Sequence, residues 1–277
     1  MVLSESERRA FGAFEKRGWN TAADPYHRHF GALTRQSSEA LLDAACVQAG
    51  RNVLDVATGP GYVAASARRR GADVIGLDFS PVQIEIARKT YPDIEFQQGD
   101  AENLLFEAGR FDAVVMGFCL VHLPNAERAI AEAFRVLKPG GYFAATVWAN
   151  PAPGTAYDIV LGAIERHGAK VDLPSGPPFF RFADPEEAGR VLAAAGFVEP
   201  RTQLVPQHWR HASPDDLFAA FTEGTVRAAA VLRAQPEQVR EKIRLAVREG
   251  VLKLGQVDGD YVIPAPAAVS SGRKPLR

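Results

Sequence analysis

Sulfur-containing residues are scarce, since the 277-residue chain holds two cysteines and two methionines. Cys46 and Cys119 cannot build a disulfide framework and suit a reducing compartment, so we expect a cytoplasmic protein. No apolar run approaches the roughly 20 residues that span a bilayer, so no membrane span is expected. The first nine residues are charged and helix-like, unlike a signal peptide.

Neither sign of charge is in excess. The chain has 32 Lys and Arg against 33 Asp and Glu, and this balance argues against a non-specific nucleic-acid binder, which needs a basic surface. The one notable basic run, residues 68–70, lies at the end of an expected helix, where positive charge interacts favourably with the helix dipole. A hydrophobic content of 47% and a charged content of 23% are typical of a soluble globular protein.

A glycine-rich turn between an apolar run and a helical segment is the strongest signal in the chain. Residues 53–56 are apolar except for Asp55, Gly59 and Gly61 follow, and residues 62–70 have a helical pattern. This order predicts a buried parallel strand, a tight turn and a helix N-terminus, where open α/β sheets bind nucleotide-like ligands. The two glycines allow a ligand to come close to the main chain.

Two cofactors fit this turn. Gly59, Gly61 and Ala64 satisfy the dinucleotide pattern G-x-G-x-x-[G/A], and Asp78 supplies the acidic residue expected about 20 positions later. Asp55 favours another ligand, because a carboxylate at the end of the strand repels a pyrophosphate and no cation is evident nearby. S-adenosylmethionine carries an ammonium and a sulfonium and no phosphate, so it suits this carboxylate.

Four further segments support the second cofactor. DVATGPG (55–61) is followed, in order, by GLDFS (76–80), GDAENL (99–104), FDAVVMGFCLVHL (111–123) and LKPGG (137–141). Together they resemble a class I S-adenosylmethionine-dependent methyltransferase, of the group that includes ubiquinone/menaquinone-type C-methyltransferases and many natural-product enzymes. The resemblance covers roughly residues 38–148. One departure is Ala57, where many relatives carry glycine, although quinone-type members often have alanine.

The resemblance implies how S-adenosylmethionine is bound. Asp78 is expected to accept hydrogen bonds from the two ribose hydroxyls. Asp100 and the backbone N–H after it are expected to recognise the adenine edge, with an ordinary loop carboxylate as the alternative. No metal site is expected, since the acidic cluster of metal-dependent catechol-type enzymes is not evident. The residues implied for the cofactor are Asp55, Ala57, Gly59, Gly61, Asp78, Phe79, Gln83, Asp100, Ala101, Glu102, Gly117 and Phe118.

The alternation of strand-like and helical segments predicts an α/β fold. We expect a doubly wound, Rossmann-like sheet of seven mostly parallel strands, with helices on both faces and a helical cap. Residues 1–36 are expected to form a helical lid and residues 37–150 the cofactor-binding core. Residues 151–277 should complete the sheet and carry the cap at about 213–254, which could contact substrate, form a dimer or simply pack on the sheet.

The last third of the chain gives weaker signals. Asp184-Pro185 and Ser213-Pro214 each predict a helix start, because a capping side chain precedes a proline. A sixth strand is expected at roughly 197–209 and a final strand near 260–263. Residues 270–275 are expected to be a frayed tail.

The sulfonium is already electrophilic, so the protein has to align the nucleophile with the methyl group and exclude water. His122 follows the fourth strand, close to the expected methyl position, and is the candidate general base; substrate contact and loop packing are the alternatives. Weaker candidates for the acceptor pocket, which core packing or a polar edge strand also explains, are Trp19, Tyr26, Trp148, His208 and Arg210.

We therefore expect an enzyme, monomeric or homodimeric, that methylates oxygen, nitrogen or carbon of a small organic acceptor. The Asn/Asp-Pro-Pro-aromatic motif of amino-methylating nucleic-acid enzymes is missing after the fourth strand. Two alternatives stay open. A nicotinamide-dependent oxidoreductase explains Gly59, Gly61 and Asp78 but leaves Asp55 without a purpose. A catalytically silent relative would keep the fold as a binding or dimerisation module.

Overall fold

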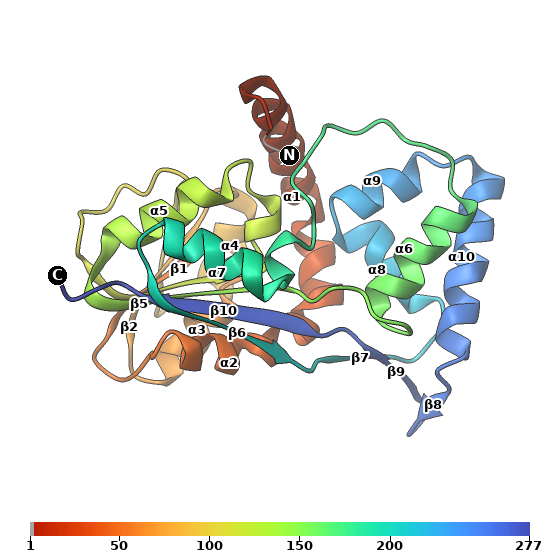
Figure 1. Ribbon diagram of the computed structural model, residues 1–277. Coiled ribbons are helices and arrows are strands. Elements are labelled where there is room, and N and C mark those ends of the chain that lie inside the picture. Colours follow the sequence, from red (N-terminus) through yellow and green to blue (C-terminus); the bar gives the residue numbers. More distant parts are fainter. Residues whose placement is uncertain (1–2) are drawn as a thin grey trace.

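The computed structural model describes residues 3–277, so two residues of the expected lid, Met1 and Val2, lie outside it. Its centre is a seven-stranded sheet (Figure 1) made of β1 (Asn52–Val56), β2 (Asp73–Asp78), β3 (Glu95–Gln98), β4 (Phe111–Gly117), β5 (Leu137–Trp148), β6 (Val198–Val205) and β10 (Ala267–Arg273). The spatial order is β3-β2-β1-β4-β5-β10-β6. Neighbours are parallel except beside β10, which runs antiparallel to β5 and β6, so the predicted fold class is confirmed.

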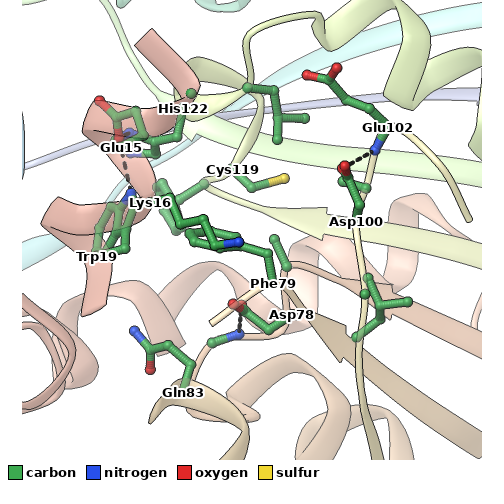
Figure 2. Close-up of a pocket in the computed structure, with 18 of the residues that line it drawn as sticks. Glu15, Lys16, Trp19, Asp78, Phe79, Gln83, Asp100, Glu102, Cys119 and His122 are labelled. Atoms are coloured by element: carbon green, nitrogen blue, oxygen red, sulfur yellow. Dashed lines mark hydrogen bonds and ion pairs between the residues drawn. The ribbon is translucent and has the colours of Figure 1, made fainter. Parts of the chain in front are cut away.

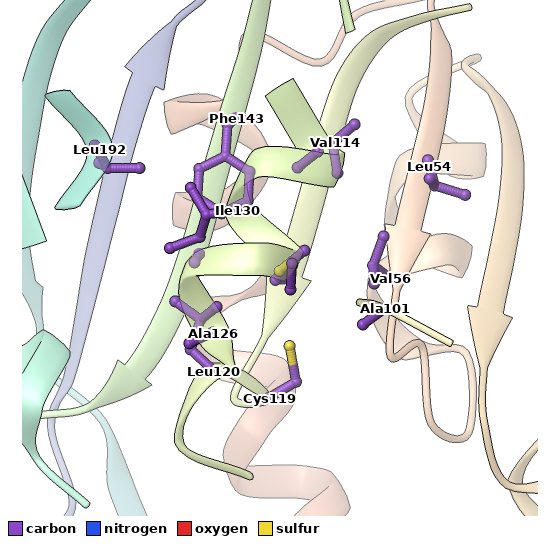
Figure 3. Close-up of a cluster of buried hydrophobic side chains, with 14 of the residues drawn as sticks. Leu54, Val56, Ala101, Val114, Cys119, Leu120, Ala126, Ile130, Phe143 and Leu192 are labelled. Atoms are coloured by element: carbon purple, nitrogen blue, oxygen red, sulfur yellow. The ribbon is translucent and has the colours of Figure 1, made fainter. Parts of the chain in front are cut away.

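Helices cover both faces of this sheet: α2 (Ser38–Ala44), α3 (Tyr62–Arg69), α4 (Pro81–Thr90), α5 (Ala126–Val136) and α7 (Pro185–Ala194). Successive strand residues point to opposite faces, so β1 supplies two separate cores. Leu54 belongs to the core under α5 and α7, while Val53 belongs to the core under α2, α3 and α4. Figure 3 shows the first core, with Ile130 of α5 and Leu192 of α7 beside Phe143 of β5.

Local signals set most helix ends in the core. Ser80 caps α4 by accepting the Gln83 N–H. Asp184 caps α7 by accepting the Glu186 N–H, as predicted. The boundary between α5 and β5 has no loop. The strand begins at Leu137, directly after the helix, so residues 138–141 open the strand instead of separating the two elements. Gly140 permits this, because its φ of +79° disfavours other residues.

A third group of elements lies beyond the sheet. In Figure 1, α1 (Glu5–Thr34) stands between the sheet and a helical group of α6 (Ala156–His167), α8 (Asp216–Gly224), α9 (Arg227–Arg233) and α10 (Glu237–Leu252). A small sheet in the order β7-β9-β8 borders this group, with β7 (His208–His211), β8 (Gln256–Val257) and β9 (Asp260–Pro264). Phe30 of α1 joins the parts, since its ring centroid lies 4.6 Å from that of Trp209 and 6.0 Å from that of Phe221.

The prediction of one strand at 197–209 is wrong. The segment forms two strands in different sheets, β6 beside β10 and β7 beside β9. Pro206 lies at the break, and it has no N–H to continue a ladder. The next residue, Gln207, is buried, and its side-chain amide donates to the Leu33 carbonyl of α1. The break therefore turns the chain from the main sheet into the small sheet.

Three further predictions for the C-terminal third need correction. A strand forms at residues 260–263 as expected, but it is β9 of the small sheet; the final core strand is β10, which includes residues expected to fray. Pairing on both sides orders β10, and the Ser270 hydroxyl bonds that of Thr202 at 2.9 Å. Helix α8 begins at Asp216, because Ser213 instead accepts the Asp215 N–H in a turn. Among residues 3–277, no helix is long and apolar enough to cross a membrane.

Candidate active site

A cavity of about 570 Å³ opens at the carboxyl ends of β1, β2 and β4. This volume lies within the range of about 300–1,000 Å³ typical of small-molecule sites. In Figure 2, Glu15 and Trp19 of α1 form one side, and Asp78 and Asp100 lie across from them. The lining includes most residues expected at the cofactor: Ala57, Gly59, Asp78, Phe79, Gln83, Asp100, Ala101, Glu102, Gly117 and Phe118.

Asp55 lies behind the glycine-rich turn, outside the wall of this cavity. The side chain is 1% exposed, and its Oδ2 accepts the Thr58 hydroxyl at 2.6 Å and the Ala64 N–H at 2.9 Å. Burial raises the pKa of Asp55 to about 7, against the effect of these two hydrogen bonds. The carboxylate therefore holds the turn against the start of α3. It also lines an adjoining pocket of about 60 Å³, which shares Gly59, among other residues, with the cavity.

The two glycines of the turn have different surroundings. A Cβ on Gly61 would stand 2.8 Å from Cζ of Phe96, so this position needs glycine for packing. Gly59 also has a left-handed φ, +53°, but a Cβ there would meet nothing within 4 Å. Since Gly59 lines the cavity, the open space beside it is space for a ligand.

Asp78, the last residue of β2, presents its carboxylate to the cavity beside the turn. Its Oδ2 accepts the Gly59 N–H at 2.9 Å, and its Oδ1 accepts the Ser80 N–H at 2.9 Å. Burial raises the pKa of Asp78 to about 6, although these hydrogen bonds favour the ionised form. Each oxygen keeps a second lone pair, so the carboxylate can also accept hydrogen bonds from a ligand diol.

The end of the cavity beyond β3 is a fixed loop. Asp100 Oδ1 accepts the Glu102 N–H at 2.8 Å, and Glu102 Oε1 accepts the Asn125 N–H at 2.7 Å. Burial raises the pKa of Glu102, and the nearby Asp100 charge adds to the rise. Ala101 is buried between them. The loop therefore presents a short apolar surface between two carboxylates, which suits a flat heterocycle with exocyclic N–H groups.

Several buried polar atoms around the cavity lack a protein partner among residues 3–277. Gln83 Oε1 and Glu15 Oε1 are such atoms in the cavity wall, and Ser38 Oγ and Thr146 Oγ1 are such atoms in the adjoining pocket. An unsatisfied buried polar group costs stability unless water or a ligand completes it. Water or a polar ligand in the cavity and the adjoining pocket can complete these atoms.

The end of the cavity under α1 is aromatic. Trp19 and Tyr26 line it with their rings edge to face at 5.2 Å, and Phe118 lies after β4 with a φ of +57°. The ring of Trp148 packs at a tilt behind that of Phe118, with 4.3 Å between the ring centroids, and lies in the core shared with α6 and α8. Of the three expected pocket aromatics, the structure thus places Trp19 and Tyr26 at the cavity and Trp148 in the core.

His122 meets a carboxylate that sequence reasoning missed. Its Nδ1 lies 3.0 Å from Glu15 Oε2, which also accepts the Trp19 indole N–H at 3.1 Å. Glu15 is 3% exposed, although glutamate on a charged helix is ordinarily solvated. The spacing of Glu15 and Trp19 shows only that they share a helix face. Their contact with the loop after β4 has no signal in the sequence.

His208 and Arg210 lie away from the cavity. Both are exposed on β7, alternating with buried Trp209, as strand geometry requires. Arg210 lies 3.5 Å from Asp260 of β9, and the His208 backbone bonds the Gln36 side chain. The structure therefore supports the alternative given for these residues, a polar strand surface.

Comparisons with known proteins agree with this geometry. Residues 54–145 match a family described as methyltransferase domain. A demethylmenaquinone methyltransferase of Thermus thermophilus is 34% identical over 187 residues, which cover 61% of this chain and 83% of that protein. The chain belongs to the class I S-adenosylmethionine-dependent methyltransferase family.

Other methyltransferases extend the comparison. A demethylmenaquinone methyltransferase of Renibacterium salmoninarum is 37% identical over 121 residues, 44% of this chain, which thus spans about half (51%) of that relative. The structure of Haemonchus contortus phosphoethanolamine N-methyltransferase 2 in complex with S-adenosyl-L-methionine has a TM-score of 0.59 at 17% identity, over 99% of this chain and 60% of that one. This second likeness shows the common methyltransferase fold.

Proposed function

We propose that this methyltransferase moves the methyl group of S-adenosylmethionine to a small organic acceptor bound beneath α1. One observation carries the proposal: a single cavity joins the glycine-rich turn, Asp78 and Asp100 to an aromatic wall that holds His122. A cofactor and an acceptor therefore have separate ends of one space, as direct transfer between them requires.

The cofactor would lie along the ends of β1, β2 and β3. Asp78 would accept the ribose hydroxyls, and the loop of Asp100, Ala101 and Glu102 would hold the adenine. The methionine end would pass Gly59, where the missing side chain leaves room. This placement directs the sulfonium toward Phe118, at the junction with the aromatic end of the cavity.

The acceptor would lie between Trp19, Tyr26 and Phe118. Aromatic walls favour a flat, largely apolar molecule, with ring pairs worth roughly 0.5–1.5 kcal/mol beyond area burial. The curated relatives named demethylmenaquinone methyltransferases make a quinol with an unmethylated ring position a first acceptor to test. The reaction is an in-line displacement in which α1 and the aromatic wall exclude water.

Calorimetric titration with S-adenosylhomocysteine, with NADH in parallel, tests the cofactor. Micromolar binding of S-adenosylhomocysteine alone is expected, whereas binding of NADH alone would return the glycine turn to the oxidoreductase alternative. Methyl transfer is then measured with a panel of phenols, quinols, amines and acidic carbon compounds. Cofactor binding without transfer to any member would favour a silent binding module.

A further inference from the structure

Glu15 is a buried carboxylate at a position where a surface helix ordinarily carries solvated charge. It lies in the middle of α1, and 107 residues of sequence separate it from His122. Its Oε2 contacts two nitrogens, Nδ1 of His122 at 3.0 Å and Nε1 of Trp19 at 3.1 Å. Burying a carboxylate is costly. The burial of Glu15 at the cavity wall, beside two nitrogen partners, therefore calls for a functional explanation.

The contact fixes the histidine ring. An ionised carboxylate only accepts hydrogen bonds, so the pairing favours the imidazole tautomer with its proton on Nδ1. The ring is further held by edge-to-face packing on Trp19 at 4.9 Å and on Phe179 at 6.0 Å. Nε2 has no hydrogen-bond partner among residues 3–277, and the side chain remains 18% exposed where it lines the cavity. Nε2 is therefore left as a free proton acceptor.

We propose that Glu15 is a positioning residue that makes His122 the general base of the acceptor site, an inference that rests on the proposed methyltransferase function. The acceptor is then a molecule that loses a proton on methylation, a hydroxyl or an acidic carbon. The proton moves to Nε2 of His122, and the freed electron pair forms the bond to the methyl carbon. The electron pair of the broken carbon–sulfur bond stays on sulfur, which gives neutral S-adenosylhomocysteine. The Glu15 carboxylate stabilises the imidazolium that results.

Other charged or titratable groups around the cavity can influence this proton transfer. Lys16 of α1 lines the same cavity, and its cation would favour an acceptor anion. The Cys119 thiol is buried, and burial raises its pKa, so it does not compete as a base. Asp78 and Glu102 lie at the cofactor end of the cavity.

A double-mutant cycle tests the proposal with an acceptor that loses a proton. His122→Ala should lower kcat about 10²–10⁴-fold, the usual range for a general base. Glu15→Gln should lower kcat at least tenfold in the wild type and have little effect in the His122→Ala protein. The Kd of S-adenosylhomocysteine should stay within about twofold. Equal losses in both backgrounds, or no loss at all, would overturn the positioning role.

Glu223→Gln is the matched control. Glu223 of α8 makes the same type of contact, 3.0 Å from Nε2 of His29 of α1, but outside the cavity lining. It should leave kcat unchanged, which separates loss of a carboxylate–histidine contact on α1 from loss of this one. A fall in kcat equal to that of Glu15→Gln would contradict the proposal.

Nitrogen-15 NMR of the histidine rings gives a readout that needs no acceptor. In the complex with S-adenosylhomocysteine, His122 should show a protonated Nδ1 and a free Nε2, and Glu15→Gln should mix the tautomers. A ring protonated on Nε2 in the wild type would overturn the inference. A wild-type protein with the expected tautomer that binds cofactor but methylates no acceptor would contradict the proposed function, and the proton-accepting role with it.

Discussion

The proposed cofactor end and the proposed acceptor end of the cavity are built in different ways. At the cofactor end, Asp78 and Asp100 come from consecutive strand–loop units. Their carboxylates accept backbone N–H groups that lie at most 19 residues away in the sequence. At the acceptor end, Glu15 and Trp19 of α1 meet His122 across more than 100 residues of sequence. The first end is local and polar, and the second is assembled from distant, largely aromatic parts.

This difference indicates how each end can vary. The cofactor end uses main-chain groups, whose positions follow from the strands and turns that carry them. The acceptor end depends on how α1 lies against the loop after β4 and against the cap, with Phe30 at the junction. A change in the packing of α1 would thus reshape the acceptor end while Asp78 and its turn stay in place.

Phe30→Ala tests whether the two ends of the cavity are coupled. The ring is 1% exposed among four aromatic neighbours, so truncation should cost about 3–5 kcal/mol of unfolding free energy. If the ends are independent, the folded variant should bind S-adenosylhomocysteine within tenfold of wild type. Chemical denaturation and calorimetry measure the two quantities. Leu204→Ala, at a side chain 70% exposed, is the control and should change stability by less than about 0.5 kcal/mol.

Gly59→Val should weaken S-adenosylhomocysteine binding at least about a hundredfold, because the new side chain fills ligand space. Gly50→Val is a matched control, since Gly50 also has a positive φ, +76°, and a Cβ there would likewise meet no atom within 4 Å. Both variants carry similar backbone strain, so both should lose similar stability on thermal unfolding. Gly50→Val should nevertheless bind normally. Normal binding by Gly59→Val would show that the ligand lies elsewhere.

Asp78→Asn should weaken S-adenosylhomocysteine binding about 10–100-fold, since a hydrogen bond to a charged group contributes about 1.5–3 kcal/mol. Calorimetry at pH 8, where the wild-type carboxyl is ionised, gives the comparison. The variant should keep its fold, because the amide oxygen can still accept one backbone N–H. An affinity equal to wild type would remove Asp78 from the cofactor site.

The pH dependence of cofactor binding tests whether the ionised form of Asp78 takes part in it. Its pKa is raised to about 6, so the carboxyl takes up a proton as the pH falls through that value and loses its charge. The affinity for S-adenosylhomocysteine should be constant above about pH 7 and fall by up to about tenfold per unit below 6. Asp78→Asn should flatten this dependence. If the pH dependence persists in the variant, it belongs to another group. Asp55, whose pKa is also raised, is the first candidate.

The residues that line the cavity at the ends of β1 and β2 could be predicted because their signals are local. The strand ending in Asp78 and the Gly59 turn each lie within a few consecutive residues, and hydrophobic pattern and turn chemistry act at that range. The same local rules failed at residues 197–209 and 270–273. There Pro206 divides a continuous strand-like pattern, and β10 is ordered only by partners on both sides.

Short motifs and the hydrophobic pattern were enough to predict the family, the fold class and most of the residues that line the cavity near the glycine-rich turn. Three placements became visible in the folded chain alone: Asp55 supports the turn from behind, Arg210 lies outside the cavity, and Glu15 holds His122. These outcomes depend on how α1 and the cap pack against the sheet. Such packing is a sum of many weak contacts between distant segments, and no short stretch of sequence encodes it.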